Sequence, residues 1–184
     1  MRVDHNGHAS LSEWWEEFLE DVKEWLEEEK EEASTNKDMT TTVGLTGSGA
    51  LGVGGSVSLG VTFDTKGNVG GSLTINGGGG FPSLGAGGYA SINNAPTIYD
   101  QEGLGTAVGA SGEPGVIAVG GDYNTLVDNA NGRTYHGGTV SVTYGLYPTI
   151  VEVHGEVGGT WVKGVNIYDV AISAVEFLQS LRLE

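Results

Sequence analysis

Hydrophobic and polar positions follow two different periods along this chain. Between residues 41 and 165, apolar side chains recur at every second position, as in Val57-Ser-Leu-Gly-Val-Thr-Phe63. This period of two is typical of β-strands that present one apolar face. Near both ends of the chain the spacing changes to three and four residues, which is typical of amphipathic helices. The pattern therefore predicts a β domain flanked by two helices.

The alternation predicts about eight strands joined by turns that are rich in Gly, Asn, Asp and Pro. The segment 64–68 has the composition of a turn and predicts a hairpin across residues 57–75. No helical segment separates the strands, which favours an antiparallel meander. A meander of eight strands closes most simply into a barrel, because closure removes exposed edges, and a two-sheet sandwich is the alternative. The predicted strands are 41–53, 57–63, 69–75, 84–92, 104–111, 116–123, 138–146 and 149–162.

The chain divides into three segments: an acidic helix and linker at 1–40, a Gly-rich β domain at 41–165, and a second helix at 166–184. In the first helix, apolar residues recur at spacings of four, three, four and three. An exposed stripe of this kind is an association site, so we expect it to be buried against the barrel or another chain. The second helix is predicted to pack on the β domain or to pair with the first. The partner-binding residues predicted in the stripe are Trp14, Trp15, Phe18 and Trp25.

Charge and composition exclude several classes of function. The chain has 24 acidic and 8 basic residues and a formal net charge of −16. This balance argues against non-specific binding of nucleic acid and against charge-driven docking on anionic membranes. Cysteine is absent, which excludes disulfides, thiolate zinc sites, iron–sulfur clusters and thiol nucleophiles. The first residues show no signal peptide, so export would depend on something outside this sequence.

The face opposite the Val/Leu stripe is unusual, because it consists of Gly, Ser, Thr and Ala. Residues 41–99 contain only two charged side chains, Asp64 and Lys66, and both lie in one turn. In a soluble barrel the apolar side chains would fill the interior, whereas in a membrane barrel they would face lipid and the small polar residues would line the lumen. Phe63, Tyr144 and Trp161 lie on the apolar face near strand ends, as either arrangement allows. The soluble arrangement is favoured, since the loops and termini carry no export or assembly signal.

Candidate chemistry lies on the last predicted strand, where Glu152, His154 and Glu156 share one face. Neighbouring carboxylates would raise the pKa of a histidine between them, and such a group could support acid–base hydrolysis. Asp122, Arg133 and His136 lie near strand ends and could join the group across a barrel. The alternative interpretation is an ordinary solvated strand face.

No cofactor or metal is predicted. Gly47-Ser-Gly49-Ala-Leu-Gly52 matches the dinucleotide-binding fingerprint in its letters. That fingerprint requires a tight turn from a strand into a helix, whereas here the alternation continues into another strand. The match is therefore attributed to the abundance of glycine, which supplies 33 residues.

The middle segment resembles a Gly-rich β module of large bacterial polymorphic toxins, including Rhs-repeat proteins. The resemblance covers about two thirds of the chain and implies a setting, exported effector proteins, without naming an activity. The N-terminal helix lies outside it. The residues that carry it are Phe63-Asp-Thr-Lys-Gly-Asn-Val-Gly70, Gly77–Gly80, Asn94-Ala-Pro-Thr-Ile-Tyr-Asp-Gln-Glu-Gly103 and Val153-His-Gly-Glu156.

Three functions remain open. The leading hypothesis is a non-enzymatic, toxin-associated module that binds a protein partner, its own copy or a membrane. The first alternative is a cation-conducting β-barrel pore, for which several chains would have to contribute strands, because eight strands enclose a side-chain-filled interior. The second alternative is a hydrolase that uses the face of Glu152, His154 and Glu156. The side on which the apolar face lies separates the pore from the soluble module.

Overall fold

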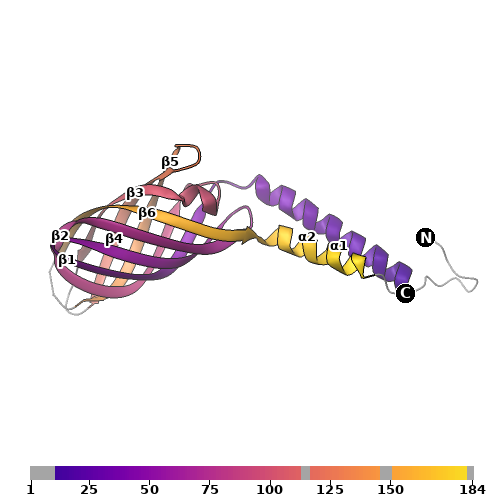
Figure 1. Ribbon diagram of the computed structural model, residues 1–184, viewed down its shortest axis with the longest axis horizontal. Coiled ribbons are helices and arrows are strands. Elements are labelled where there is room, and N and C mark those ends of the chain that lie inside the picture. Colours follow the sequence, from indigo (N-terminus) through magenta and orange to yellow (C-terminus); the bar gives the residue numbers. More distant parts are fainter. Residues whose placement is uncertain (1–10, 113–116, 146–150, 182–184) are drawn as a thin grey trace, which may run out of the picture.

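The molecule is a β-barrel with a stalk of two helices projecting from one end (Figure 1). The computed structural model describes residues 11–112, 117–145 and 151–181, without the side chains of 11, 12, 52, 80–83, 151 and 152. The predicted class, a closed antiparallel barrel of eight strands with two helices, is confirmed. The elements in chain order are α1 (Leu11–Ser34), β1 (Thr40–Asp64), β2 (Asn68–Asn93), the 3-10 turn η1 (Ile98–Gln101), β3 (Gly103–Gly112), β4 (Ile117–Asp128), β5 (Thr134–Gly145), β6 (Val151–Asn166) and α2 (Ile167–Ser180).

Six continuous strands make the eight-stranded wall because β1 and β2 each contribute twice. Together they form one long hairpin, in which Phe63 pairs with Val69 and Thr40 with Asn93. The hairpin folds over at its middle, so that the two halves of β1 lie side by side and the Ser58 hydroxyl reaches that of Thr46 at 2.8 Å. The first half of β2 then pairs with β6 and its second half with β5. The order β6–β3–β4–β5 completes the closed ring.

The order of the strands departs from the predicted meander. The two halves of β2 are separated in the wall by both halves of β1, and the chain also crosses over between β2 and β3 and between β5 and β6. Alternation identifies strands and their faces but carries no information on which strand pairs with which. The long continuous register between β1 and β2 keeps the two strands paired on both sides of the fold, and this pairing places both halves of β1 between the halves of β2.

The apolar side chains lie on the outside of the barrel, which contradicts the favoured soluble arrangement. Leu45, Leu59, Leu104 and Val140 are each exposed over 60–72% of their surface. Their sequence neighbours point inward, and inward Thr62 and Ser72 are buried. The predicted division of residues 56–75 into two opposite faces is therefore confirmed, while the predicted side of each face is wrong. Phe63, Tyr144 and Trp161 also face outward.

The inner surface is concave and too crowded for side chains at many glycine positions. A Cβ atom built on Gly44 would overlap the Leu59 carbonyl, and one on Gly87 would overlap that of Val142. Outward glycines are different, because a Cβ on Gly71 has nothing within 4 Å. The face rich in small residues therefore fits inside the curve, and the bulky apolar face is left outside.

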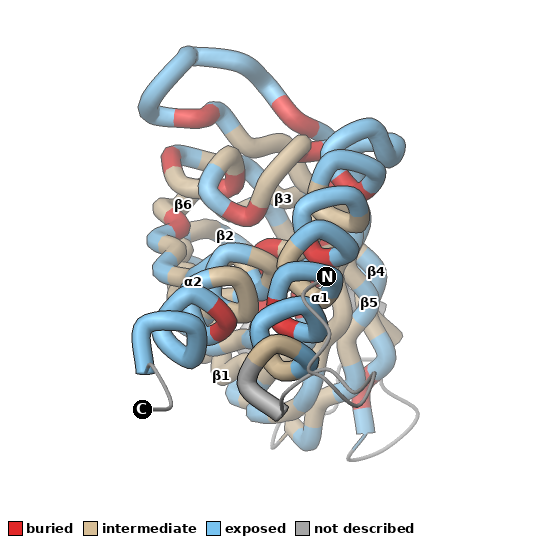
Figure 2. Tube along the Cα trace, turned by 90° about the vertical axis from the view of Figure 1, so that its right-hand side faces the viewer, coloured by how far each residue is buried: buried red, intermediate tan, exposed pale blue. Residues whose placement is uncertain are grey.

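Helices α1 and α2 pack along each other and project away from the barrel (Figures 1 and 2). Their seam contains Leu19, Leu26 and Val175, which are buried, and Trp15 packs against it. Of the two roles predicted for the second helix, pairing with the first is the one observed, because the apolar face of α2 packs against that of α1. Salt bridges from Lys23 to Glu176 and from Lys30 to Asp169 reinforce the pair.

Of the four predicted partner-binding residues, only Trp15 belongs to the helix seam. Trp14, Phe18 and Trp25 are exposed over 53%, 43% and 55% of their surface. Neither the barrel wall nor α2 covers these three side chains. Their proposed role in binding a partner is therefore still a prediction, and the seam accounts for only part of the aromatic stripe.

Replacement of Gly87 by Ala should destabilise the barrel, whereas replacement of the adjacent Gly88 should not. Gly87 faces inward against the β5 backbone, while the nearest atom to a Cβ on outward Gly88 is a carbonyl oxygen at 3.7 Å. Overpacking of this kind costs about 1–3 kcal/mol. The free energies of unfolding of the two variants in denaturant provide the test, and equal values would contradict the steric argument.

Candidate functional site

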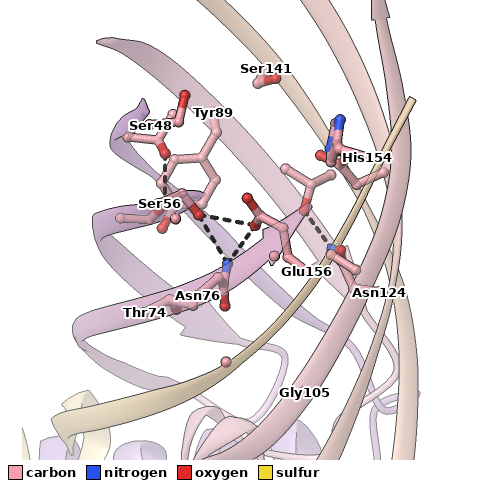
Figure 3. A pocket seen from close by; sticks show the side chains of 18 of the residues that line it. Ser48, Ser56, Thr74, Asn76, Tyr89, Gly105, Asn124, Ser141, His154 and Glu156 are labelled. Carbon is pink, nitrogen blue, oxygen red and sulfur yellow. Dashed lines mark hydrogen bonds and ion pairs between the residues drawn. The ribbon is translucent and has the colours of Figure 1, made fainter. Parts of the chain in front are cut away.

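The barrel encloses a polar cavity of about 230 Å³ that runs along its interior. Hydroxyl and amide side chains from every part of the wall line it, and Figure 3 shows them converging on a common space. A lining of this kind holds water and ions, because hydroxyl and amide groups replace part of their hydration shell. Representative lining residues are Thr46, Ser58, Thr74, Asn124, Ser141 and Thr160.

Glu156 on β6 is held in the cavity by partners from two other segments. Its Oε2 atom accepts hydrogen bonds from Ser56 Oγ at 3.0 Å and from Asn76 Nδ2 at 2.9 Å (Figure 3). Asn76 also donates to the Ser56 hydroxyl at 3.2 Å. Gly158 makes the arrangement possible, because a Cβ there would overlap the Asn76 amide. One carboxylate oxygen is thus held in place by two donors.

His154 and Asp122 form a second cluster, which bridges a whole strand. His154 Nε2 lies 2.7 Å from Asp122 Oδ1, although β3 separates their strands, β6 and β4. Gly109 stands between them in the register, and a Cβ at this position would overlap the Asp122 carboxylate. Both side chains are largely buried, with 22% and 16% of their surface exposed. Asp122 therefore joins His154, as predicted, but it does so from the middle of β4 and over one intervening strand of the wall, not across the barrel.

The other predicted members of this group lie elsewhere. Glu152 pairs with Ser111 in the strand register, but its side chain lies outside the described residues. Arg133 is exposed in the turn before β5. His136 faces outward, where its Nδ1 lies 2.8 Å from the Tyr123 hydroxyl and the two rings stack. The cavity thus holds two of the three predicted residues in separate hydrogen-bonded clusters.

The end of the cavity next to the stalk is closed by residues 94–102, which we call the plug. Ala95 and Ile98 in the plug are completely buried. Ile98 packs where β2 and β6 have glycines, since a Cβ on Gly70 or Gly164 would come within 2.9 Å of its Cδ1 atom. An apolar side chain is thereby seated between two strands of the wall.

Hydrogen bonds fix the plug to the strands around it. Gln101 Nε2 donates to Thr62 at 2.8 Å, and its Oε1 accepts from Asn93 at 3.0 Å. Asp64 Oδ2 accepts from the Ile98 backbone amide at 2.9 Å. The Thr97 and Asp100 side chains form a capping box around η1. Because the buried amide groups of the plug have hydrogen-bond partners on the surrounding strands, the plug closes this end of the barrel in one defined arrangement.

Tyr89 on β2 projects into the same interior, close to the wall at Gly60. A Cβ on Gly60 would come within 2.6 Å of the Tyr89 hydroxyl, so the missing side chain at Gly60 leaves room for the phenol. The phenol also forms a hydrogen bond with Ser72.

The lumen offers fixed charge and hydroxyl groups rather than a metal centre. Among the side chains that the structure describes, no three His, Asp or Glu residues gather closely enough to hold a metal ion. Asp122 is paired with His154, and the donors to Glu156 are the neutral side chains of Ser56 and Asn76. The described interior around Glu156 is accordingly favourable to cations and unfavourable to anions.

Sequence analysis missed Ser56, Asn76 and Gln101 as functional residues. Ser56 and Asn76 occupy the small polar face of their strands, and only the register that pairs them directly brings them to Glu156. Gln101 carries no pattern signal, because it lies in an irregular segment. A signal was available in the glycines, since an inward glycine marks a place where a neighbouring side chain crosses the wall.

In the described part of the chain, neither helix combines the length and apolar character needed to cross a membrane. A scan against protein-family models finds no match, and a search of curated proteins finds no relative. The resemblance to polymorphic-toxin modules therefore remains a prediction, and the argument for function rests on the geometry.

Proposed function

We propose that this chain is a membrane-inserting β-barrel whose hydrophilic lumen provides a narrow, cation-favouring path that the plug closes. The observation that carries the proposal is the outward apolar face, which runs around the wall on both halves of β1 and β2 and on all later strands. Bilayer-spanning barrels have this arrangement of apolar outside and polar inside. In water the same surface would favour association, since large apolar patches on soluble monomers are rare.

The distribution of charge on the wall supports insertion. Among the described outward-facing residues of the strands, Lys163 is the only Asp, Glu, Lys or Arg, and it lies three residues before the end of β6 near the stalk. Strands β4 and β5 have 12 residues each, which exceeds the 9–11 residues of a tilted membrane strand. Closure of the ring also satisfies the backbone hydrogen bonds that lipid would leave unpaired.

The proposed barrel is formed by one chain, whereas the pore hypothesis from the sequence required several chains to contribute strands. A single chain supplies the entire ring, so insertion requires no strands from other copies. Eight strands leave little free interior, and we therefore propose passage of water and small ions only. The setting in an exported toxin is compatible with this proposal, but the membrane barrel is argued independently of it.

The hydrolase hypothesis is less favoured. His154 Nε2 is engaged with Asp122, and Glu156 Oε2 with Ser56 and Asn76, all inside the barrel. A substrate would have to be small enough to enter a cavity of about 230 Å³ inside the barrel. The partner-binding hypothesis concerns the stalk, and it is compatible with a barrel in the membrane.

A lysine at mid-height on the outer wall should prevent insertion, whereas a lysine near the stalk should not. Leu59 lies in the middle of the second half of β1, and Val165 lies two residues beyond the natural Lys163. In a bilayer the first position costs about 2–4 kcal/mol and the second about 0–1 kcal/mol. After flotation, little Leu59→Lys protein should therefore be recovered with zwitterionic vesicles, whereas Val165→Lys protein should be recovered to the same extent as the wild type. Equal recovery of the two variants would contradict a lipid-facing wall.

Loosening the plug should open the lumen to ions. Ile98→Ser removes the apolar contact over Gly70 and Gly164, so potassium leakage from vesicles should rise several-fold above that of the wild type. Adding Glu156→Gln to this variant should lower the preference for potassium over chloride, because the fixed lumenal charge is lost. Asn124→Asp serves as the opposite change and should raise this preference. If Ile98→Ser inserts normally and its potassium leakage equals that of the wild type, conduction through the lumen is refuted, whereas insertion of the barrel into the membrane is not.

A further inference from the structure

The stalk carries a second apolar face that the α1–α2 seam does not use. Successive residues of a helix are 100° apart, so Trp25 projects about 200° away from Lys23 on α1. Leu178 stands in the same relation to Glu176 on α2. Since Lys23 and Glu176 form a salt bridge on one side of the stalk, Trp25 and Leu178 project from the other side.

Aromatic side chains dominate this second face. Trp14 and Phe18 stack with their ring centroids 5.6 Å apart, and Trp25 lies two turns beyond Phe18. On α2 the face continues with Leu178 and Leu181, exposed over 40% and 53% of their surface. Clustered Trp and Phe side chains are typical of the centres of protein interfaces. We call these five residues the aromatic stalk face.

Acidic residues surround the aromatic stalk face. Helix α1 has eleven acidic residues and two lysines, and both lysines are engaged in salt bridges with α2. Asp21 and Glu28 follow Trp14 at spacings of seven, which places them beside the aromatic side chains along one line of the helix. Helix α2 contains no lysine or arginine. An occupant of this face therefore meets a strongly negative border.

We infer that the aromatic stalk face binds a cationic amphipathic helix from another protein. An apolar stripe on such a helix would cover Trp14, Phe18 and Trp25, and its lysines or arginines would pair with the acidic border. A second copy of the stalk would bring like charge against like charge. A lipid surface is disfavoured by the direction of the stalk, which continues the long axis of the barrel (Figure 1). The inference does not depend on insertion, because the stalk lies outside the barrel.

Two designed peptides test this inference on the full chain. Each has 18 residues and the same leucine stripe, and the polar positions are lysine in one and glutamate in the other. Binding is measured by fluorescence anisotropy to the protein in zwitterionic nanodiscs, with empty nanodiscs as the reference. The lysine peptide should bind at least about tenfold more tightly than the glutamate peptide, and its affinity should fall as salt is added. Equal affinities would overturn the inference.

Matched variants locate the binding surface. Phe18→Ser with Trp25→Ser should weaken binding of the lysine peptide at least about tenfold. Asp21→Asn with Glu28→Gln should weaken binding of the lysine peptide about threefold and reduce the salt dependence of this binding. The control, Glu20→Gln with Glu27→Gln on the far side of α1, should leave both the affinity and its salt dependence unchanged. The charge variants leave the apolar residues intact, so they remain informative if the serine variant fails to fold. If both pairs of charge variants changed peptide binding equally, the proposed surface would be refuted. Protein dimers that are abolished by Phe18→Ser with Trp25→Ser would also refute it, because the occupant of the face would then be a second copy of the chain.

Discussion

The structure depends on the crowding of the inner barrel surface, where eight strongly coiled strands leave little room for side chains. Inward positions such as Gly44, Gly87 and Gly158 tolerate no Cβ without overlap. In a strand, the residues that alternate with these glycines must point to the opposite side. The bulky apolar residues consequently face outward with few exceptions, and the lumen wall consists mainly of small or hydrogen-bonding residues, with Leu126 as an apolar member. Curvature and alternation together therefore decide which surface meets the surroundings.

The same glycines determine how polar groups in the lumen find partners. At some inward glycines a side chain reaches over the strand that lacks a Cβ, as Asp122 and His154 do over Gly109. None of the buried side-chain nitrogen and oxygen atoms in the described residues lacks a hydrogen-bond partner. A fully satisfied network keeps each side chain in one position, because any alternative would leave a polar group unpaired. The plug extends this network to the stalk end, where Gln101 bonds to β1 and β2.

Much of the fold follows from the sequence, since alternation predicts the strands, the hairpin across residues 57–75 and the eight-stranded closure. The strand order does not, because pairing depends on long-range register. The direction of the apolar face was assigned wrongly, because signals for export were given more weight than the glycines opposite it. In the site, the shared face identified His154 and Glu156, and Asp122 was expected to join them, whereas the partners of Glu156 required the register.

The position of β2 between distant parts of the chain affects the timing of folding. Asn68 pairs with Asn166 in the strand register, 98 residues later, so the ring stays open until β6 is available. Until then both edges of the sheet expose unpaired backbone groups, which lipid does not tolerate. Non-local pairings of this kind also make folding slow, since the entropy of loop closure must be overcome first. The hairpin of β1 and β2 needs no later strand for its own ladder, whereas closure of the ring needs β6. In the proposed membrane barrel, insertion would therefore follow synthesis of β6, and a chain that lacks this strand would stay at the lipid–water boundary.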